Sequence, residues 1–197
     1  MRSILRAAVL LVAAALPCSA QVSTWQIDPA HSAAQFSVRH MMISTVRGDF
    51  QKMTGMMQLD EKDITKSTIE VTIDTTTVDT REPKRDAHLK TPDFLDVANF
   101  PTITFKSKSV SAAGAGRLKV TGDLTIRGVT KEVVLDVEGP TPALKVGNGT
   151  RRGVSATTKI NRKDFGVSWS RALDGGGVVV SDEVNITLDV ELLLKTQ

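Results

Sequence analysis

Three histidines, His31, His40 and His88, are the first candidates for chemistry in this chain of 197 residues. Three imidazole nitrogens form the ligand set of many catalytic zinc sites. His31 and His40 are an odd number of positions apart, so an unbroken strand would point them to opposite faces of a sheet. We therefore expect structural or rim roles for the histidines and no metal site.

Nucleophilic catalysis has little support in the sequence. A Gly-x-Ser-x-Gly elbow is absent, and the single cysteine, Cys18, lies in the amino-terminal leader described below. Gly175-Gly-Gly is not followed by the Lys-Ser/Thr of a phosphate-binding loop, so it predicts a turn. Without a convergent acid, base and nucleophile, we expect no catalytic residues and no enzyme.

Four cations lie close together in the sequence: Arg81, Lys84, Arg85 and Lys90. Arginine presents a planar fork that matches phosphate oxygens, so this group is a candidate site for a phosphate headgroup. The alternative is a solvated charged loop. We favour the loop because three acids are interleaved and offset the local positive potential: Glu82, Asp86 and Asp93.

The amino terminus resembles a secretory signal. Arg2 and Arg6 precede an apolar run over residues 7–16, and a small-residue site follows at residues 18–20. The run is too short to span a membrane. A lipoprotein with a modified Cys18 is the alternative, but the preceding Leu and Pro are not the small residues such a site requires. We expect cleavage near Ala20, leaving one domain over residues 21–197.

Removal of residues 1–20 changes what composition implies. The remaining chain has 177 residues (197 minus 20), and its formal charge falls from +3 to +1 because two arginines leave. A nearly neutral protein gives no reason to expect a nucleic-acid partner. Residues 21–197 contain no cysteine, so this domain must be stable without disulfides in the periplasm or outside the cell.

Most of the mature chain alternates apolar and polar residues, as half-buried β-strands do. The pattern is clear over residues 32–40, 67–78 and 184–194. We also expect a bend near Thr54-Gly55 and a strand that places Phe165, Val167 and Trp169 on one face. Eight or nine strands result, and βαβ alternation is absent.

Residues 86–106 form the one long interruption of this β pattern. Thr91 or Asp93 can cap a helix, Pro92 suits a first helical position, and apolar residues follow at Phe94 and Leu95. The segment predicts a short helix that covers one end of the sheet.

Regular strand spacing and hairpin-length turns predict an all-β fold, either a sandwich or a closed antiparallel barrel. We favour an extended barrel of about eight strands because several strands reach about ten residues, and such a barrel can hold one small ligand. Its interior would be largely aliphatic. We expect an acyl or isoprenoid chain to contact the following inward residues: Phe36, Val38, Met42, Phe50, Met57, Ile73, Phe94, Ile103, Phe105, Leu124, Ile126 and Trp169.

Six motifs in order resemble the YceI family across nearly the whole mature chain. They are Trp25-Gln-Ile-Asp-Pro-Ala-His-Ser with Phe36-Ser-Val-Arg-His-Met, Val46-Arg-Gly-Asp-Phe, His88-Leu-Lys-Thr-Pro-Asp-Phe-Leu-Asp, Phe100-Pro-Thr-Ile-Thr-Phe, Gly122-Asp-Leu-Thr-Ile-Arg-Gly-Val-Thr and Asn161-Arg-Lys-Asp-Phe-Gly-Val. The resemblance implies a lipocalin-like barrel, commonly dimeric, that binds a polyisoprenoid or other long-chain amphiphile in its lumen. It implies no agreed catalytic activity.

Two functional hypotheses follow. The first is a carrier or sequestering protein for a long-chain lipid, which contacts a membrane only transiently for loading and needs no cofactor. The second is an enzyme or redox accessory that acts on a lipid or quinone held in the same barrel. The lack of a convergent catalytic set favours the carrier.

Overall fold

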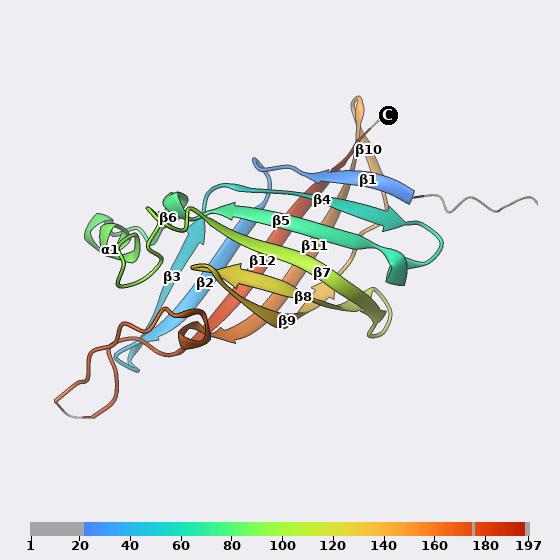
Figure 1. Cartoon of the computed structure of the whole chain (residues 1–197). Helices are drawn as coiled ribbons and strands as arrows, with labels where there is room; N and C mark the ends of the chain where they lie inside the picture. The colour runs from blue at the N-terminus through green and yellow to red at the C-terminus, as the bar shows by residue number, and fades with distance from the viewer. Residues whose placement is uncertain (1–21, 175, 196–197) are drawn as a thin grey trace, which may run out of the picture.

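The computed structural model describes residues 22–174 and 176–195; the expected signal segment lies outside them. Strands dominate, with one α-helix and three 3-10 helices (Figure 1). The strands are β1 (Val22–Ile27), β2 (Ala33–His40), β3 (Ser44–Phe50), β4 (Met53–Asp60), β5 (Thr68–Asp74), β6 (Val78–Asp79), β7 (Thr102–Ala112), β8 (Arg117–Ile126), β9 (Val129–Glu138), β10 (Leu144–Val146), β11 (Gly149–Asn161) and β12 (Glu183–Leu194). The helices are η1 (Ile64–Lys66), η2 (Thr75–Thr77), α1 (Pro83–Leu89) and η3 (Arg162–Phe165).

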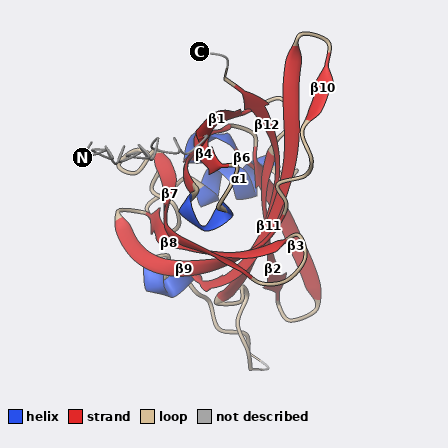
Figure 2. Cartoon of the chain, turned by 90° about the vertical axis from the view of Figure 1, so that its right-hand side faces the viewer, coloured by secondary structure: helices blue, strands red, loops and turns tan. Residues whose placement is uncertain are grey.

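Eight of these strands close into an antiparallel barrel, which confirms the predicted fold class. The ring runs β11-β9-β8-β7-β5-β4-β1-β12, and β12 pairs back with β11. The closing ladder is long and regular, from Arg151 opposite Leu193 to Asn161 opposite Glu183. Viewed along the barrel, α1 lies behind the ring of strands (Figure 2).

One strand of the ring changes partner along its length. Residues 192–194 of β12 pair with β1, whereas residues 185–189 pair with β2. Residues 28–32 join β1 to β2 at this switch and form the wall joint. Beyond it, the β2–β3 hairpin extends past the ring, and β3 pairs with β6 at two positions only.

The period-two pattern sends apolar side chains into the barrel. Trp25, Ile27, Met53 and Leu192 are almost fully buried. Inward residues of all eight ring strands belong to one continuous apolar cluster. The barrel therefore has a single apolar core, which the inward side chains of the ring strands form.

The covering segment exists, but its predicted helix is misplaced. The helix is α1, with Glu82 as N-cap and Pro83 at the first turn, not the segment after Thr91. Residues 91–100 form successive turns instead. Asp96 adopts a positive φ of 49°, and the amides of Leu95 and Val97 bond to carbonyls six and seven residues earlier, so the α-helical ladder is not continued.

Two other expectations were wrong in detail. The break after β3 falls at residues 51–52, and Thr54-Gly55 lies inside β4. Phe165, Val167 and Trp169 do not share a strand: Phe165 ends η3, and the others begin a long loop over residues 166–182. Within residues 22–174 and 176–195, no helix has the length and apolar character that crossing a membrane requires.

Candidate ligand-binding lumen

The barrel encloses a cavity of about 250 Å³. Its lining is almost entirely aliphatic and aromatic, with few polar side chains, among them Gln35, Thr158 and Arg162. The cavity is elongated: on β8 alone its lining extends from Leu118 to Ile126, about 25 Å along a strand and about 20 Å along the axis of a tilted barrel. A narrow apolar channel suits an extended chain better than a compact ligand.

Most of the residues expected in the lumen do line this cavity. They are Phe36, Phe50, Met57, Ile73, Phe94, Ile103, Phe105, Leu124 and Ile126. Strand alternation identified all of them except Phe94, because the inward faces of the ring strands and of the adjoining β2–β3 hairpin also face the cavity. Phe94 lies in the covering segment, where its apolar character was the signal.

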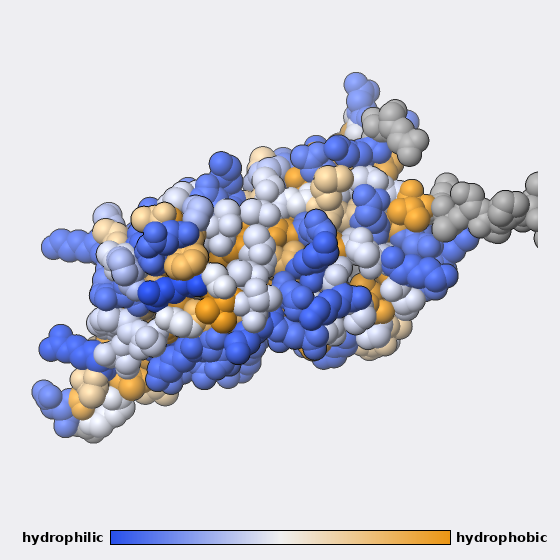
Figure 3. All heavy atoms as spheres, in the orientation of Figure 1, coloured by the Kyte–Doolittle hydropathy of each residue, from blue (hydrophilic) through white to orange (hydrophobic). Residues whose placement is uncertain are grey.

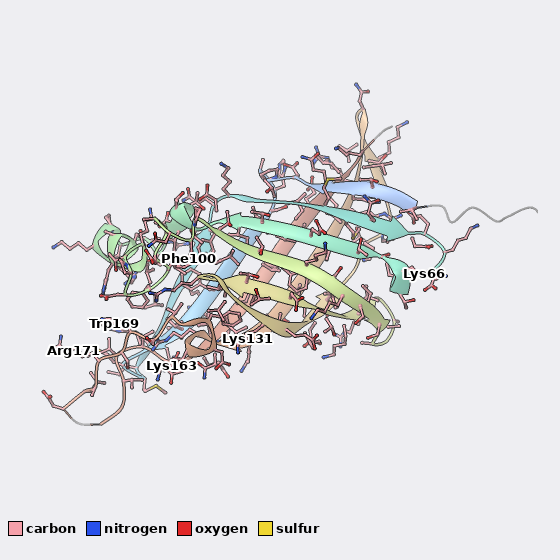
Figure 4. All side chains as sticks on the ribbon, viewed as in Figure 1. Lys66, Phe100, Lys131, Lys163, Trp169 and Arg171 are labelled. Carbon is pink, nitrogen blue, oxygen red and sulfur yellow. The ribbon has the colours of Figure 1, made fainter. Side chains whose placement is uncertain are left out.

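Val38, Met42 and Trp169 lie outside the cavity, which corrects their predicted position. Val38 pairs with Val46 on the part of the β2–β3 hairpin that projects beyond the ring. Met42 is at the tip of that hairpin and is 59% exposed. Trp169 lies on the 166–182 loop (Figure 4), where its ring packs against that of Phe94.

The prediction also missed part of the lining. The largest omissions are the inward faces of β11 and β12, with four lining residues each; those of β12 are Val184, Ile186, Leu188 and Val190. The same alternation marks these residues in the sequence. Ile64 and Leu89 were missed for another reason: they lie on short helices, where a period of two gives no signal.

Two glycines make room for aromatic rings of the lining. A Cβ on Gly48 would lie 2.5 Å from the Phe36 ring, and one on Gly122 would lie 2.5 Å from the Phe105 ring. Such distances are too short for any substituent. The glycines thus fix the positions of two of the rings that line the cavity.

At the cap end, aromatic side chains join two separate segments. The Phe94 ring lies 5.2 Å from that of Trp169, and His88 contacts both edge-on at 5.0 and 5.4 Å. Phe94 and His88 belong to the α1–Phe100 segment, and Trp169 belongs to the 166–182 loop. Because Phe94 also lines the cavity, this cluster joins the covering segment and the loop at the cavity wall.

The 166–182 loop is held by a buried arginine. Arg162 is 5% exposed. Its guanidinium donates to the Asp182 carboxylate and to four carbonyl oxygens, those of Val167, Trp169, Val180 and Ser181. Burial lowers the pKa of Arg162, and Asp182 partly opposes this shift. The arginine therefore binds mainly backbone carbonyls of the loop. Two of these carbonyls belong to residues 165–169, where a strand was predicted, and they bond to Arg162 and not to a neighbouring strand.

The wall joint is held by charged groups. Arg151 contacts the carboxylates of Asp28 and Glu191, and the Nδ1 of His31 lies 2.9 Å from Asp28. Hydrogen bonds from His31, the Ala30 amide and Arg151 keep the pKa of Asp28 below its ordinary value. Among the described residues, ligand atoms of Asp28, His31 and Glu191 are grouped within 4.8 Å. Arg151 pairs with both carboxylates and offsets one of their two charges, so we interpret the group as an ion-pair cluster.

The other histidines and the basic segment have local partners. His88 bonds to Asp93, and His40 ends β2, so the structure does not bring the three histidines together. Arg85 donates to the hydroxyl and carbonyl of Thr80, whose amide and hydroxyl donate to Asp86. These bonds tie α1 to the strand before it, so Lys84 and Arg85 lie on a helix and not in the solvated loop that we expected.

A closed antiparallel barrel of eight strands with an elongated apolar lumen belongs to the class of barrels whose interior can hold one small ligand. Within that class, a model of the YceI-like domain matches residues 25–192. A UPF0312 protein of Vibrio parahaemolyticus is 37% identical over 85% of this chain and 89% of its own length. A UPF0312 protein of Staphylococcus aureus is 34% identical over 86% and 97%. The chain belongs to the YceI family.

Solved structures agree with this assignment. The Campylobacter jejuni YceI protein has a TM-score of 0.68 and 30% identity, covering 79% of this chain and 88% of that one. A polyisoprenoid binding domain from Saccharophagus degradans has a TM-score of 0.64 over 87% and 98%, at 14% identity. The second similarity shows the shared barrel fold.

Proposed function

We propose that this protein is an exported carrier that binds a polyisoprenoid or other long-chain amphiphile in its barrel. The observation that carries the proposal is the elongated cavity of about 250 Å³ with its nearly uniform apolar lining. Drug-sized ligands occupy rounder pockets of about 300–1,000 Å³ that combine apolar walls with several placed polar groups. A single flexible chain fits the dimensions of this lumen better.

Affinity in such a lumen comes from the chain. Each buried methylene contributes about 0.8 kcal/mol, so a long tail needs no specific polar contact. Met53 and Met57 line the wall, and their flexible thioether side chains adapt to irregular ligands. Arg162 is the one charged residue among the described residues of the lining, and its guanidinium already donates to loop carbonyls. We therefore expect weak selectivity for the headgroup.

The comparisons support the same assignment. The Saccharophagus degradans relative in fold is described as a polyisoprenoid binding domain. The leader-like sequence of residues 1–20 supports export to the periplasm or beyond, with the membrane as a transient source of lipid. An enzyme or redox accessory acting on a bound quinone is the second hypothesis. It lacks support in the lining, where the described residues place no acid, base and nucleophile together.

Two substitutions test the lumen directly. Phe105→Trp and Leu124→Trp add volume to opposed positions of the β7–β8 wall. If the lumen holds a chain, each variant should lose bound long-chain lipid and bind a fluorescent fatty-acid probe at least about ten-fold more weakly, while stability changes little. Val134→Trp is the matched control because Val134 lies on the neighbouring strand and is 45% exposed.

The alternative is an interior filled by the protein's own side chains. If the interior is simply a packed core, overpacking costs about 1–3 kcal/mol and shifts the urea midpoint. A loss of stability in both variants, with no lipid or probe bound by the parent protein, would overturn the carrier function.

A further inference from the structure

The tip of the β2–β3 hairpin exposes three consecutive large apolar residues, Met41, Met42 and Ile43. Ile43 is 80% exposed and Met42 is 59% exposed. Orange apolar atoms lie among blue polar ones on the projecting lower-left lobe in Figure 3, which contains this tip and the 166–182 loop in Figure 1. Scattered apolar residues are ordinary on a surface, but a contiguous group at a projecting tip indicates a contact site.

The turn itself argues against a purely structural role for these side chains. Met41 and Met42 have φ values of 51° and 60°, and the Ile43 amide bonds to the His40 carbonyl. Positive φ at both central residues is the geometry of a type I′ hairpin turn, which strongly favours Asn-Gly. Two methionines here carry backbone strain that other residues would relieve. Strain of this kind is concentrated at functional positions.

Two carbonyl groups of the tip are already hydrogen-bonded by a side chain of the same hairpin. Arg39 donates one guanidinium nitrogen to the carbonyls of Met42 and Ile43, and another to the hydroxyl of Thr45. An unpaired carbonyl resists transfer out of water. Because Arg39 pairs these two carbonyls, the tip can enter an apolar phase at a lower desolvation cost.

Positive charge surrounds the tip. Arg39 and Arg47 lie on the same outer face of the hairpin, opposite Thr45 and Ser37 in the ladder. Arg171 lies on the adjoining loop, where Val179 bridges it to Met41 through backbone hydrogen bonds. The guanidinium groups of Arg47 and Arg171 bond to none of the residues that the structure describes. The acids nearby are Asp49, on the same face of β3 as Arg47, and Asp174 on the loop. The three arginines outnumber these two acids.

We propose that the tip surface, formed by Arg39, Met41, Met42, Ile43, Arg47 and Arg171, docks onto an anionic lipid bilayer. Apolar side chains that enter the interface and cations that meet lipid phosphates together produce this kind of binding. A stable protein partner needs about 20–30 residues on each side, far more than this tip offers. Membrane docking would give the proposed lipid carrier its contact with a lipid source. The biological purpose of docking rests on the proposed function, but the docking itself does not.

Vesicle co-sedimentation tests the apolar part. The intact mature protein should bind vesicles of phosphatidylcholine mixed with phosphatidylglycerol. Ile43→Asp and Met42→Ser should each lower the partition coefficient at least about ten-fold, because each removes an apolar side chain from the interface. Leu144→Asp is the control: Leu144 is 64% exposed on β10, away from the tip, and its replacement should leave binding unchanged.

The charged part is separable from the apolar part. Arg47→Ala and Arg171→Ala should each weaken binding to the mixed vesicles about five-fold, the effect of one cation near an anionic surface. Binding to pure phosphatidylcholine should not change with either substitution. Added salt should reduce the difference between the two vesicle types, because exposed charges are screened.

A turn replacement separates docking from folding. Met41→Asn combined with Met42→Gly suits the type I′ geometry, so it should raise the urea midpoint and yet abolish most vesicle binding. Full binding by this variant, or by Ile43→Asp, would overturn the proposal, as would equal losses in Leu144→Asp. Lipid content of each variant, measured by mass spectrometry, reports separately on the lumen, so failure of docking would leave the carrier function standing.

Discussion

Arg151 and Arg162 lie at opposite ends of β11, and each holds a place where the regular barrel ladder is interrupted. Arg151 binds the carboxylates of Asp28 and Glu191 at the wall joint and is partly open to solvent. Arg162 is buried and binds mainly carbonyl oxygens of the 166–182 loop. Arginine therefore stabilises both interruptions, one through ion pairs with carboxylates and the other through hydrogen bonds to backbone carbonyls.

The difference determines how each break responds to solvent. Carboxylates gain protons in acid, so the wall joint depends on pH. Carbonyl oxygens do not titrate, and arginine stays charged in proteins, so the loop contact should hold over a wide pH range. Of the groups that Arg162 binds, only the Asp182 carboxylate titrates, so we expect acid to leave most of the loop contact intact.

The largest effect is expected at the buried arginine. Arg162→Met leaves the loop carbonyl oxygens without their donor and breaks the ion pair with Asp182, which should cost about 3–5 kcal/mol of unfolding free energy. Urea denaturation followed by circular dichroism measures it. The neighbouring Lys163 pairs with the same carboxylate but is half-exposed, so Lys163→Ala should cost less than about 1 kcal/mol. Equal losses of unfolding free energy in the two variants would contradict the role of Arg162 in holding the loop.

A smaller and pH-dependent effect is expected at the wall joint. Asp28 is 8% exposed, and Asp28→Asn should cost about 1–2 kcal/mol at neutral pH by weakening its charged hydrogen bonds. The folded protein lowers the pKa of Asp28, chiefly through the His31 hydrogen bond. The stabilisation is therefore present above the unfolded pKa, near 3.8, and is lost as pH falls through the lower folded pKa.

Urea titrations of parent and Asp28→Asn between neutral pH and pH 3 check this sign. The difference between them should shrink on acidification, whereas the Arg162→Met difference should persist. A gap between parent and Asp28→Asn that is constant with pH would show that the carboxylate charge does not stabilise the joint.

The sequence predicted the barrel because every ring strand buries one face, and alternation records that directly. It misplaced the helix because two segments carry a prolyl start, Pro83 and Pro92, and local rules do not choose between them. It predicted a strand at residues 165–169 because alternation says nothing of Arg162, whose long-range bonds to the loop carbonyls decide the backbone there.

Alternation also predicted much of the lining of the lumen. Inward residues such as Phe105 and Leu124 were found because face and cavity coincide in a closed ring. Val38 was misplaced because its strand outruns the ring, which depends on how β12 divides its pairing between β1 and β2. The role proposed for Met42 required a backbone angle and an exposure, neither of which is encoded in an apolar pattern.

The central claim is that the lumen holds a long-chain amphiphile. Mass spectrometry of the organic extract from purified, undenatured protein tests it most directly. We predict long-chain lipid in near-stoichiometric amount from the parent and from Val134→Trp, and a clear deficit from Leu124→Trp. Extracts free of such lipid, together with no uptake of an added polyisoprenoid by the parent protein, would contradict the account.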